Sequence, residues 1–202
     1  MDPFEEATRA FVALVAEIPA NRWAGPGLGE WDLRALVGHT SRALVTVETY
    51  LDRPAAAVTV SGPVAYFAGA AASDPAAVAD RGRRAGTALG ADPAGAVATL
   101  ADRVLARVAG AGNPVIETVA GGMRLRDYLP TRTYELVVHG LDITAALGRP
   151  PYPYGPELLG QVLDLTGRIA VARGDGPVLL GALTGRTRLP EGFSVLEPPR
   201  VV

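Results

Sequence analysis

Hydrophobic positions recur at helical spacing along most of the chain and predict a mostly helical protein. Before Pro19, the apolar positions that follow this spacing are Phe4, Ala7, Phe11, Leu14, Val15 and Ile18. A second apolar series runs from Leu33 to Leu51 and ends before Pro54. Each series gathers its apolar side chains on one face, which is the pattern of an amphipathic helix packed against a core.

Helix start signals recur along the chain. Asp-Pro pairs stand at residues 2–3, 74–75 and 92–93, and Asp32 precedes the second apolar series. Aspartate caps the free amides of a helix amino terminus, and proline fits its first turn. We therefore expect a helix after each of these four signals.

The second half of the chain predicts further helices and one hairpin. Asp127 is expected to open a helix over residues 127–147, because Pro130 is tolerated only in a first turn and Gly148 can end the helix. Other expected elements are a hairpin over residues 115–125 with its turn at Gly121-Gly122, helices over residues 158–171 and 178–183, and a turn-rich tail. Residues 21–31 read as a loop, and residues 55–73 show no firm period.

Neither an internal repeat nor a linker between two cores is visible in the sequence. This pattern predicts an all-α protein, a helical bundle that carries a small, partly extended α+β appendage at its carboxyl end. We expect residues 1–150 to form the bundle. Residues 151–202 are expected to form a carboxy-terminal helix and a short tail packed on it.

Composition narrows the classes of function. The net charge is -2, whereas a protein that binds along the phosphates of a nucleic acid needs an excess of basic residues. The run from Arg81 to Arg84 is interpreted as a solvated helix face. No apolar stretch is long enough to span a bilayer, and no secretory signal pattern begins the chain, so a cytoplasmic protein is expected. The chain has no cysteine, so any thiol chemistry needs a thiol from outside.

Both histidines of the chain fall inside expected helices and suggest a metal site. Glu135 and His139 are four residues apart, so they share one helix face, and His39 can join them from a neighbouring helix. Two imidazoles and one carboxylate leave a coordination position open, as in catalytic zinc sites. The alternative is that these are core or partly exposed histidines, since a Glu–His pair at this spacing is common on helices.

Two segments resemble the metal motifs of a known family. The segments GLGEWDLRALVGHTSRAL and RTYELVVHGLDITAALGRP resemble the first and second motifs of the mycothiol-dependent maleylpyruvate isomerase family, within the DinB-like superfamily. The ending ALTGRTRLPEGFSVL also resembles tails of short members. The resemblance implies a DinB-like four-helix bundle, a divalent metal on His39, Glu135 and His139 with zinc expected, and mycothiol as cosubstrate. DinB-like bundles often dimerise, so a homodimer is a further expectation.

The same resemblance implies a metal-dependent, thiol-using enzyme that acts on a small electrophilic molecule by isomerisation or S-transfer. The alternative is a non-catalytic or thiol-independent DinB-like binding protein, including one recruited to a biosynthetic pathway, because fold alone does not fix function. Asp142 is either a partner of His139 or a surface carboxylate. Arg132 either orients Glu135 or a substrate acid group, or lies on the surface. In the family an arginine of the carboxy-terminal region contributes to catalysis; the tail offers Arg186 and Arg188 for this role, and Arg186 is the residue expected to fill it.

Overall fold

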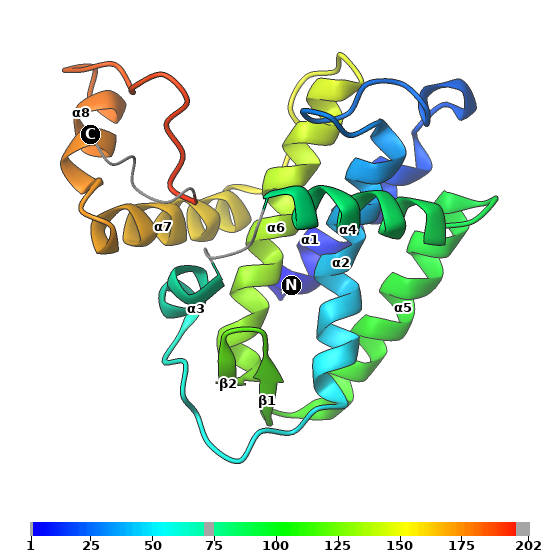
Figure 1. Cartoon of the computed structure of the whole chain (residues 1–202), viewed down its shortest axis with the longest axis horizontal. Coiled ribbons are helices and arrows are strands. Elements are labelled where there is room, and N and C mark those ends of the chain that lie inside the picture. Colours follow the sequence, from blue (N-terminus) through cyan, green and yellow to red (C-terminus); the bar gives the residue numbers. More distant parts are fainter. Residues whose placement is uncertain (1, 71–74, 197–202) are drawn as a thin grey trace.

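The computed structural model describes residues 2–70 and 75–196 and is dominated by helices (Figure 1). Its elements, in chain order, are α1 (Pro3–Ala16), the 3₁₀ helix η1 (Ala20–Arg22), α2 (Leu33–Leu51), α3 (Pro63–Ala70), α4 (Pro75–Ala88), α5 (Pro93–Ala111), β1 (Val115–Thr118), β2 (Gly121–Arg124), α6 (Leu125–Ala146), α7 (Pro156–Ala172) and α8 (Gly176–Leu183). The expected mostly helical fold with a small two-stranded sheet is confirmed. Within the described ranges, the helices are too short or too polar to cross a membrane.

The predicted start signals are confirmed where the structure describes them. Asp2 accepts hydrogen bonds from the backbone amides of Phe4 and Glu5, as an N-cap of α1 should. Asp32 caps α2, and Asp92 caps α5 by accepting from the amide of Gly95 at 3.0 Å. The predicted capping residue of α4, Asp74, lies outside the described residues.

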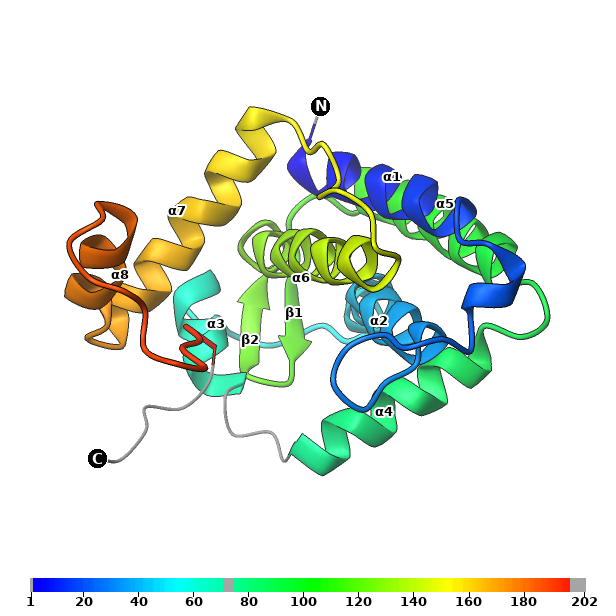
Figure 2. The ribbon, with the colours of Figure 1, turned by 90° about the horizontal axis from the view of Figure 1, so that it is seen from above.

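Four helices form the bundle that holds the core. Helix α6 packs on α1 and α2, and α5 closes the ring by packing on the same two helices. Viewed from above, α6 lies between the other three helices of the bundle and the pair α7 and α8 (Figure 2). The largest side chains buried within the bundle include Phe4, Phe11, Leu36, Leu44, Tyr128 and Leu136. Their burial supplies the main favourable term in the folding free energy.

Helix α4 crosses α2 at unusually close range (Figure 1). A Cβ added at Gly38 would overlap the backbone of Ala85 and Gly86, and one added at Gly86 would come within 2.7 Å of the Arg34 carbonyl oxygen. One turn earlier on α4, a Cβ at Gly82 would meet the Trp31 ring. Side chains at these positions are therefore excluded, and the absence of Cβ atoms sets the distance between the two helices.

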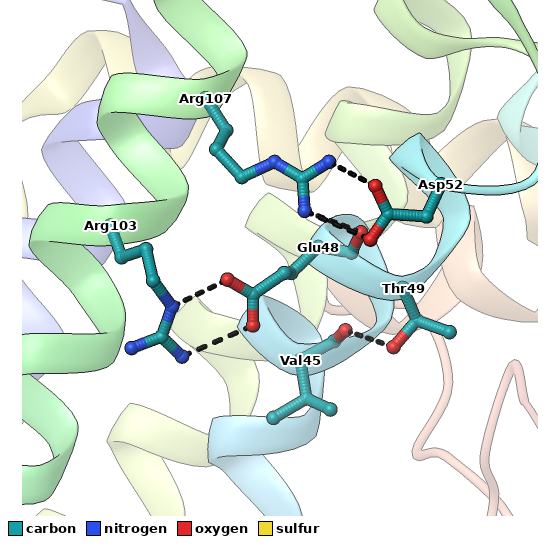
Figure 3. A network of polar contacts seen from close by, with 6 residues as sticks. All are labelled: Val45, Glu48, Thr49, Asp52, Arg103 and Arg107. Atoms are coloured by element: carbon teal, nitrogen blue, oxygen red, sulfur yellow. Dashed lines mark hydrogen bonds and ion pairs between the residues drawn. The ribbon is translucent and has the colours of Figure 1, made fainter.

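Two ion pairs join the solvent side of α2 to α5 (Figure 3). Arg103 contacts Glu48 with a shortest distance of 2.5 Å, and Arg107 holds Asp52 through two hydrogen bonds. Arg107 also donates to the Glu48 carbonyl oxygen at 3.2 Å. These contacts fix the register of the two helices more than they stabilise the fold, because exposed pairs are screened by water and salt.

The hairpin and the start of α6 differ in detail from the sequence prediction. The β1–β2 turn falls at Val119-Ala120, whereas Gly121 and Gly122 belong to the second strand. Helix α6 begins at Leu125 rather than after Asp127, because the Asn113 side chain accepts the amide hydrogen of Arg126 at 2.9 Å. Pro130 therefore lies in the second turn, on an exposed face of the helix.

Helix α3 lies within residues 55–73, where the hydrophobic positions showed no firm period. It packs on α6 and on α7, and α7 in turn carries α8. The predicted helices over residues 158–171 and 178–183 are confirmed as α7 and α8, each starting two residues earlier. The segment before α7 also contacts the bundle, since the Tyr154 hydroxyl fills the space that a side chain at Gly140 would need.

Candidate metal centre

His39 lies on α2, directly after Gly38, where α2 and α4 come into contact. Trp31, in the loop before α2, stacks on the His39 ring with 4.5 Å between centroids. The Trp31 indole nitrogen donates to the Ala79 carbonyl oxygen on α4 at 3.0 Å, which fixes the indole in place. His39 Nδ1 is buried and has no hydrogen-bond partner among the described residues. Buried polar nitrogens are seldom left unpaired, so this atom calls for a ligand or an ion.

Helix α6 supplies the other two candidate ligands from one face. His139 Nε2 lies 3.3 Å from Glu135 Oε2, and the His39 and His139 rings meet edge to face with centroids 4.9 Å apart. Ligand atoms of His39, Glu135 and His139 all fall within 4.8 Å of one another. The structure therefore brings together the three residues that the sequence singled out, from two helices of the bundle.

Asp142 lies beside this cluster as a partner of His139. His139 Nδ1 lies 2.9 Å from Asp142 Oδ2, where its hydrogen can be donated to the carboxylate, and Nε2 is the ring nitrogen on the Glu135 side. This is the arrangement that orients ligating histidines in metal sites. Of the two readings of Asp142 that the sequence left open, the hydrogen-bonded partner is the one that the structure supports.

Burial and charge set different pKa values for the three residues. Desolvation, followed by the nearby His139, lowers the pKa of His39 to about 4, so that this imidazole is neutral at physiological pH. Burial opposes the charge on Glu135, but the hydrogen bond to His139 and the positive charge of Arg132 outweigh it and lower its pKa to about 2. Burial likewise opposes the charge on His139, but hydrogen bonds to Asp142 and Glu135 raise its pKa to about 9.

Arg132 is buried, so the reading of this residue as a surface arginine is wrong. Its guanidinium lies over the rings of Tyr66 and Tyr128, at 5.1 and 5.0 Å from their centroids, and Nε donates to Thr131 Oγ1 at 2.9 Å. The guanidinium acts on Glu135 through its charge, which lowers the pKa of the carboxyl. Cations held against aromatic faces keep their charge at low desolvation cost.

Arg186 is not among the residues that gather at this centre. It follows α8, is exposed and donates to the Thr184 carbonyl oxygen of its own turn at 2.6 Å. Helix α8 packs on α7, on the side of α6 away from α2 (Figure 2). The catalytic role of Arg186 stays a prediction.

Sequence reasoning missed two arginines near the centre. Arg42 follows His39 by one turn of α2, and Arg81 projects from α4; the charge of each lowers the pKa of His39. Both are half-buried, whereas Arg83 and Arg84 are exposed, so the solvated helix face predicted for this run holds only for the last two. The spacing between His39 and Arg42 is the signal that was available, because residues three apart share a helix face.

A helical bundle with two histidines and one glutamate converging near one end of its core defines the class of this protein as a DinB-like candidate metalloprotein. The family model described as mycothiol maleylpyruvate isomerase N-terminal domain matches residues 4–144. The chain belongs to this family, and the match includes His39, Glu135 and His139. Comparison with curated proteins gave no match, nor did comparison with solved structures.

Proposed function

We propose that the chain is a cytoplasmic, metal-dependent enzyme that uses mycothiol to act on a small electrophilic molecule, by isomerisation or S-transfer. In this proposal His39, Glu135 and His139 hold a divalent metal, with zinc as the expected ion. The observation that carries it is the convergence of three ligand atoms within 4.8 Å at a partly exposed position. The side chains of Glu135 and His139 are 22% and 15% exposed, so each is in part open to solvent.

The donor set fits a divalent metal. Two atoms bound tetrahedrally at the usual zinc distances are about 3.3 Å apart, and the His139 Nε2 to Glu135 Oε2 distance is 3.3 Å. His39 offers a neutral ring with an unpaired Nδ1, and Asp142 holds the tautomer in which His139 Nε2 can bind. Three protein ligands also leave a position for a small molecule, as catalytic sites do.

Each residue around the centre has a defined part in this chemistry. When bound, a divalent cation lowers the pKa of a coordinated thiol, which is then a thiolate nucleophile at neutral pH. Asp142 orients His139, the charge of Arg132 keeps Glu135 ionised, and Trp31 shields one face of His39 from water. The chain itself has no cysteine, so the thiol has to be a cosubstrate.

Two outcomes follow from thiolate addition to an activated double bond. The thiolate sulfur supplies the electron pair of the new C–S bond, the π pair of the double bond moves onto the neighbouring acceptor group, and the bond that is now single can rotate. If the thiolate then leaves, the product is the cis–trans isomer. If the carbon next to the acceptor group takes a proton instead, the product is the thiol conjugate.

Elemental analysis of the purified protein tests the metal site. We expect one equivalent of metal after reconstitution, lost in His139→Ala and retained in a control, Glu157→Ala, which changes an exposed carboxylate at the start of α7. Absence of bound metal after reconstitution of the folded wild-type protein would refute the site. A metal-loaded protein that neither isomerises nor conjugates activated alkenes with mycothiol would support the binding-protein alternative.

A further inference from the structure

Trp31 contacts both the candidate metal centre and helix α4. Its indole stacks on the His39 ring, with 4.5 Å between the centroids and 34° between the ring planes. The indole nitrogen donates to the Ala79 carbonyl oxygen on α4 at 3.0 Å. A Cβ added at Gly82 would lie 2.7 Å from two carbon atoms of the same indole. The indole therefore presents a face to His39 and the edge that carries its nitrogen to α4.

The backbone of Trp31 is held as well as its side chain. The Trp31 amide donates to the Leu28 carbonyl oxygen at 2.9 Å, and the Trp31 carbonyl oxygen accepts from the Gly27 amide at 2.9 Å. Gly27 permits this close turn, because a Cβ there would lie 2.9 Å from the Trp31 carbonyl oxygen. Two hydrogen bonds from the backbone and one from the indole therefore leave the Trp31 ring little freedom to move.

His39 and His139 are restrained in different ways. A ligating histidine is normally oriented by a hydrogen bond to its second ring nitrogen, and Asp142 offers this bond to His139. His39 Nδ1 is buried and has no hydrogen-bond partner among residues 2–70 and 75–196. Aromatic contacts restrain the His39 ring instead: the stack on Trp31 and the edge-to-face contact with His139.

We propose that Trp31 is a positioning residue for His39, and that α4 sets the orientation of this imidazole through the Trp31 ring. The stack limits rotation about the side-chain bonds of His39, so the ring stays beside His139 before a metal arrives. A ligand group that is ordered in advance loses less entropy on binding. The consequence for metal affinity rests on the proposed function, whereas the orientation of His39 by Trp31 does not.

Zinc competition titrations test the effect on metal affinity. We expect Trp31→Leu to weaken zinc binding about 3–10-fold, the scale of ordering one side chain. The matched control is Trp23→Leu, which changes the other tryptophan of the chain; its ring lies beside Arg34, and the affinity should change less than twofold. Trp31→Phe keeps an aromatic face and should fall between the two. The visible spectrum of cobalt-loaded protein, which reports the ligand geometry, should change in Trp31→Leu and stay unchanged in Trp23→Leu. Equal weakening in both leucine variants would refute the proposal.

A double-mutant cycle tests the route from α4. Gly82→Ala brings a methyl group against the indole edge and should weaken zinc binding about threefold in the wild-type background. In the Trp31→Leu background the ring is absent, so the same change should alter the affinity less than twofold. Equal effects of Gly82→Ala in both backgrounds would refute a route through Trp31, because independent effects add.

Measurements on metal-free protein separate this proposal from the metal centre. Three-bond NMR couplings about the Cα–Cβ bond of His39 should show one rotamer in the wild type and averaged rotamers in Trp31→Leu. If the wild type takes up no zinc but the couplings show this difference, the metal centre is refuted and the positioning role is supported. Couplings of His39 that are the same in Trp31→Leu and in the wild type would refute the positioning role, whether or not zinc binds.

Discussion

Substitution of Gly38 by alanine should loosen the contact between α2 and α4 and lower stability. The atoms in the way of the new methyl group belong to the backbone of Ala85 and Gly86, so no side chain can rotate to make room. Overpacking of this kind costs about 1–3 kcal/mol, and the rigid obstacle favours the upper part of that range. Alanine returns about 1 kcal/mol through its better helix propensity. We therefore expect a net loss of about 2 kcal/mol.

A matched control for this prediction is Gly160→Ala on α7. No heavy atom lies within 4 Å of a Cβ placed there, so this variant should gain up to about 1 kcal/mol through helix propensity alone. Urea and thermal unfolding compare the two variants with the wild type, and Gly38→Ala should melt about 4–8 °C lower, given 2–4 °C per kcal/mol for a chain of this size. Equal stabilities of the two variants would show that the helices do not touch as described. Because His39 follows Gly38 directly, zinc affinity should fall as well.

Two further predictions concern the candidate metal centre. Asp142→Asn should weaken zinc binding about 10–100-fold, as loss of a partner of a ligating histidine usually does, whereas Asp164→Asn on α7 should leave it unchanged in a competition titration. In metal-free protein, proton NMR should show one histidine titrating near pH 4 and the other near pH 9. The pKa of His139 is raised from 6.5 in the unfolded chain to about 9 in the folded protein. Its contribution to the free energy of unfolding is therefore full below pH 6.5 and is lost as the pH rises through 9. Two histidines that both titrate near pH 6.5 would refute the buried environment described for this site.

Local rules predicted those parts of the fold that local chemistry decides. Aspartate caps such as Asp32 act within one turn, so their helix starts could be read directly. Helix α3 was not predicted because nearly all of its residues are apolar, so that no polar face gives a helical period. Its position is set by packing on α6 and α7. The start of α6 was not predicted because its capping group is distant in the sequence. The Asn113 side chain accepts a hydrogen bond from the backbone amide of Arg126, thirteen residues later.

In the candidate site, too, local spacing predicted some of the residues, whereas the others depend on how the helices pack. The spacing of Glu135 and His139 is a local signal, but the approach of His39 from α2 depends on the bundle. The half-buried Arg81 was misread because the Arg81 to Arg84 run looks uniformly solvated. Gly82 lets α4 lie directly against Trp31, and Arg81, the residue before it, is half-buried. Glycines four apart on α4, Gly82 and Gly86, were the sequence signal for this close approach.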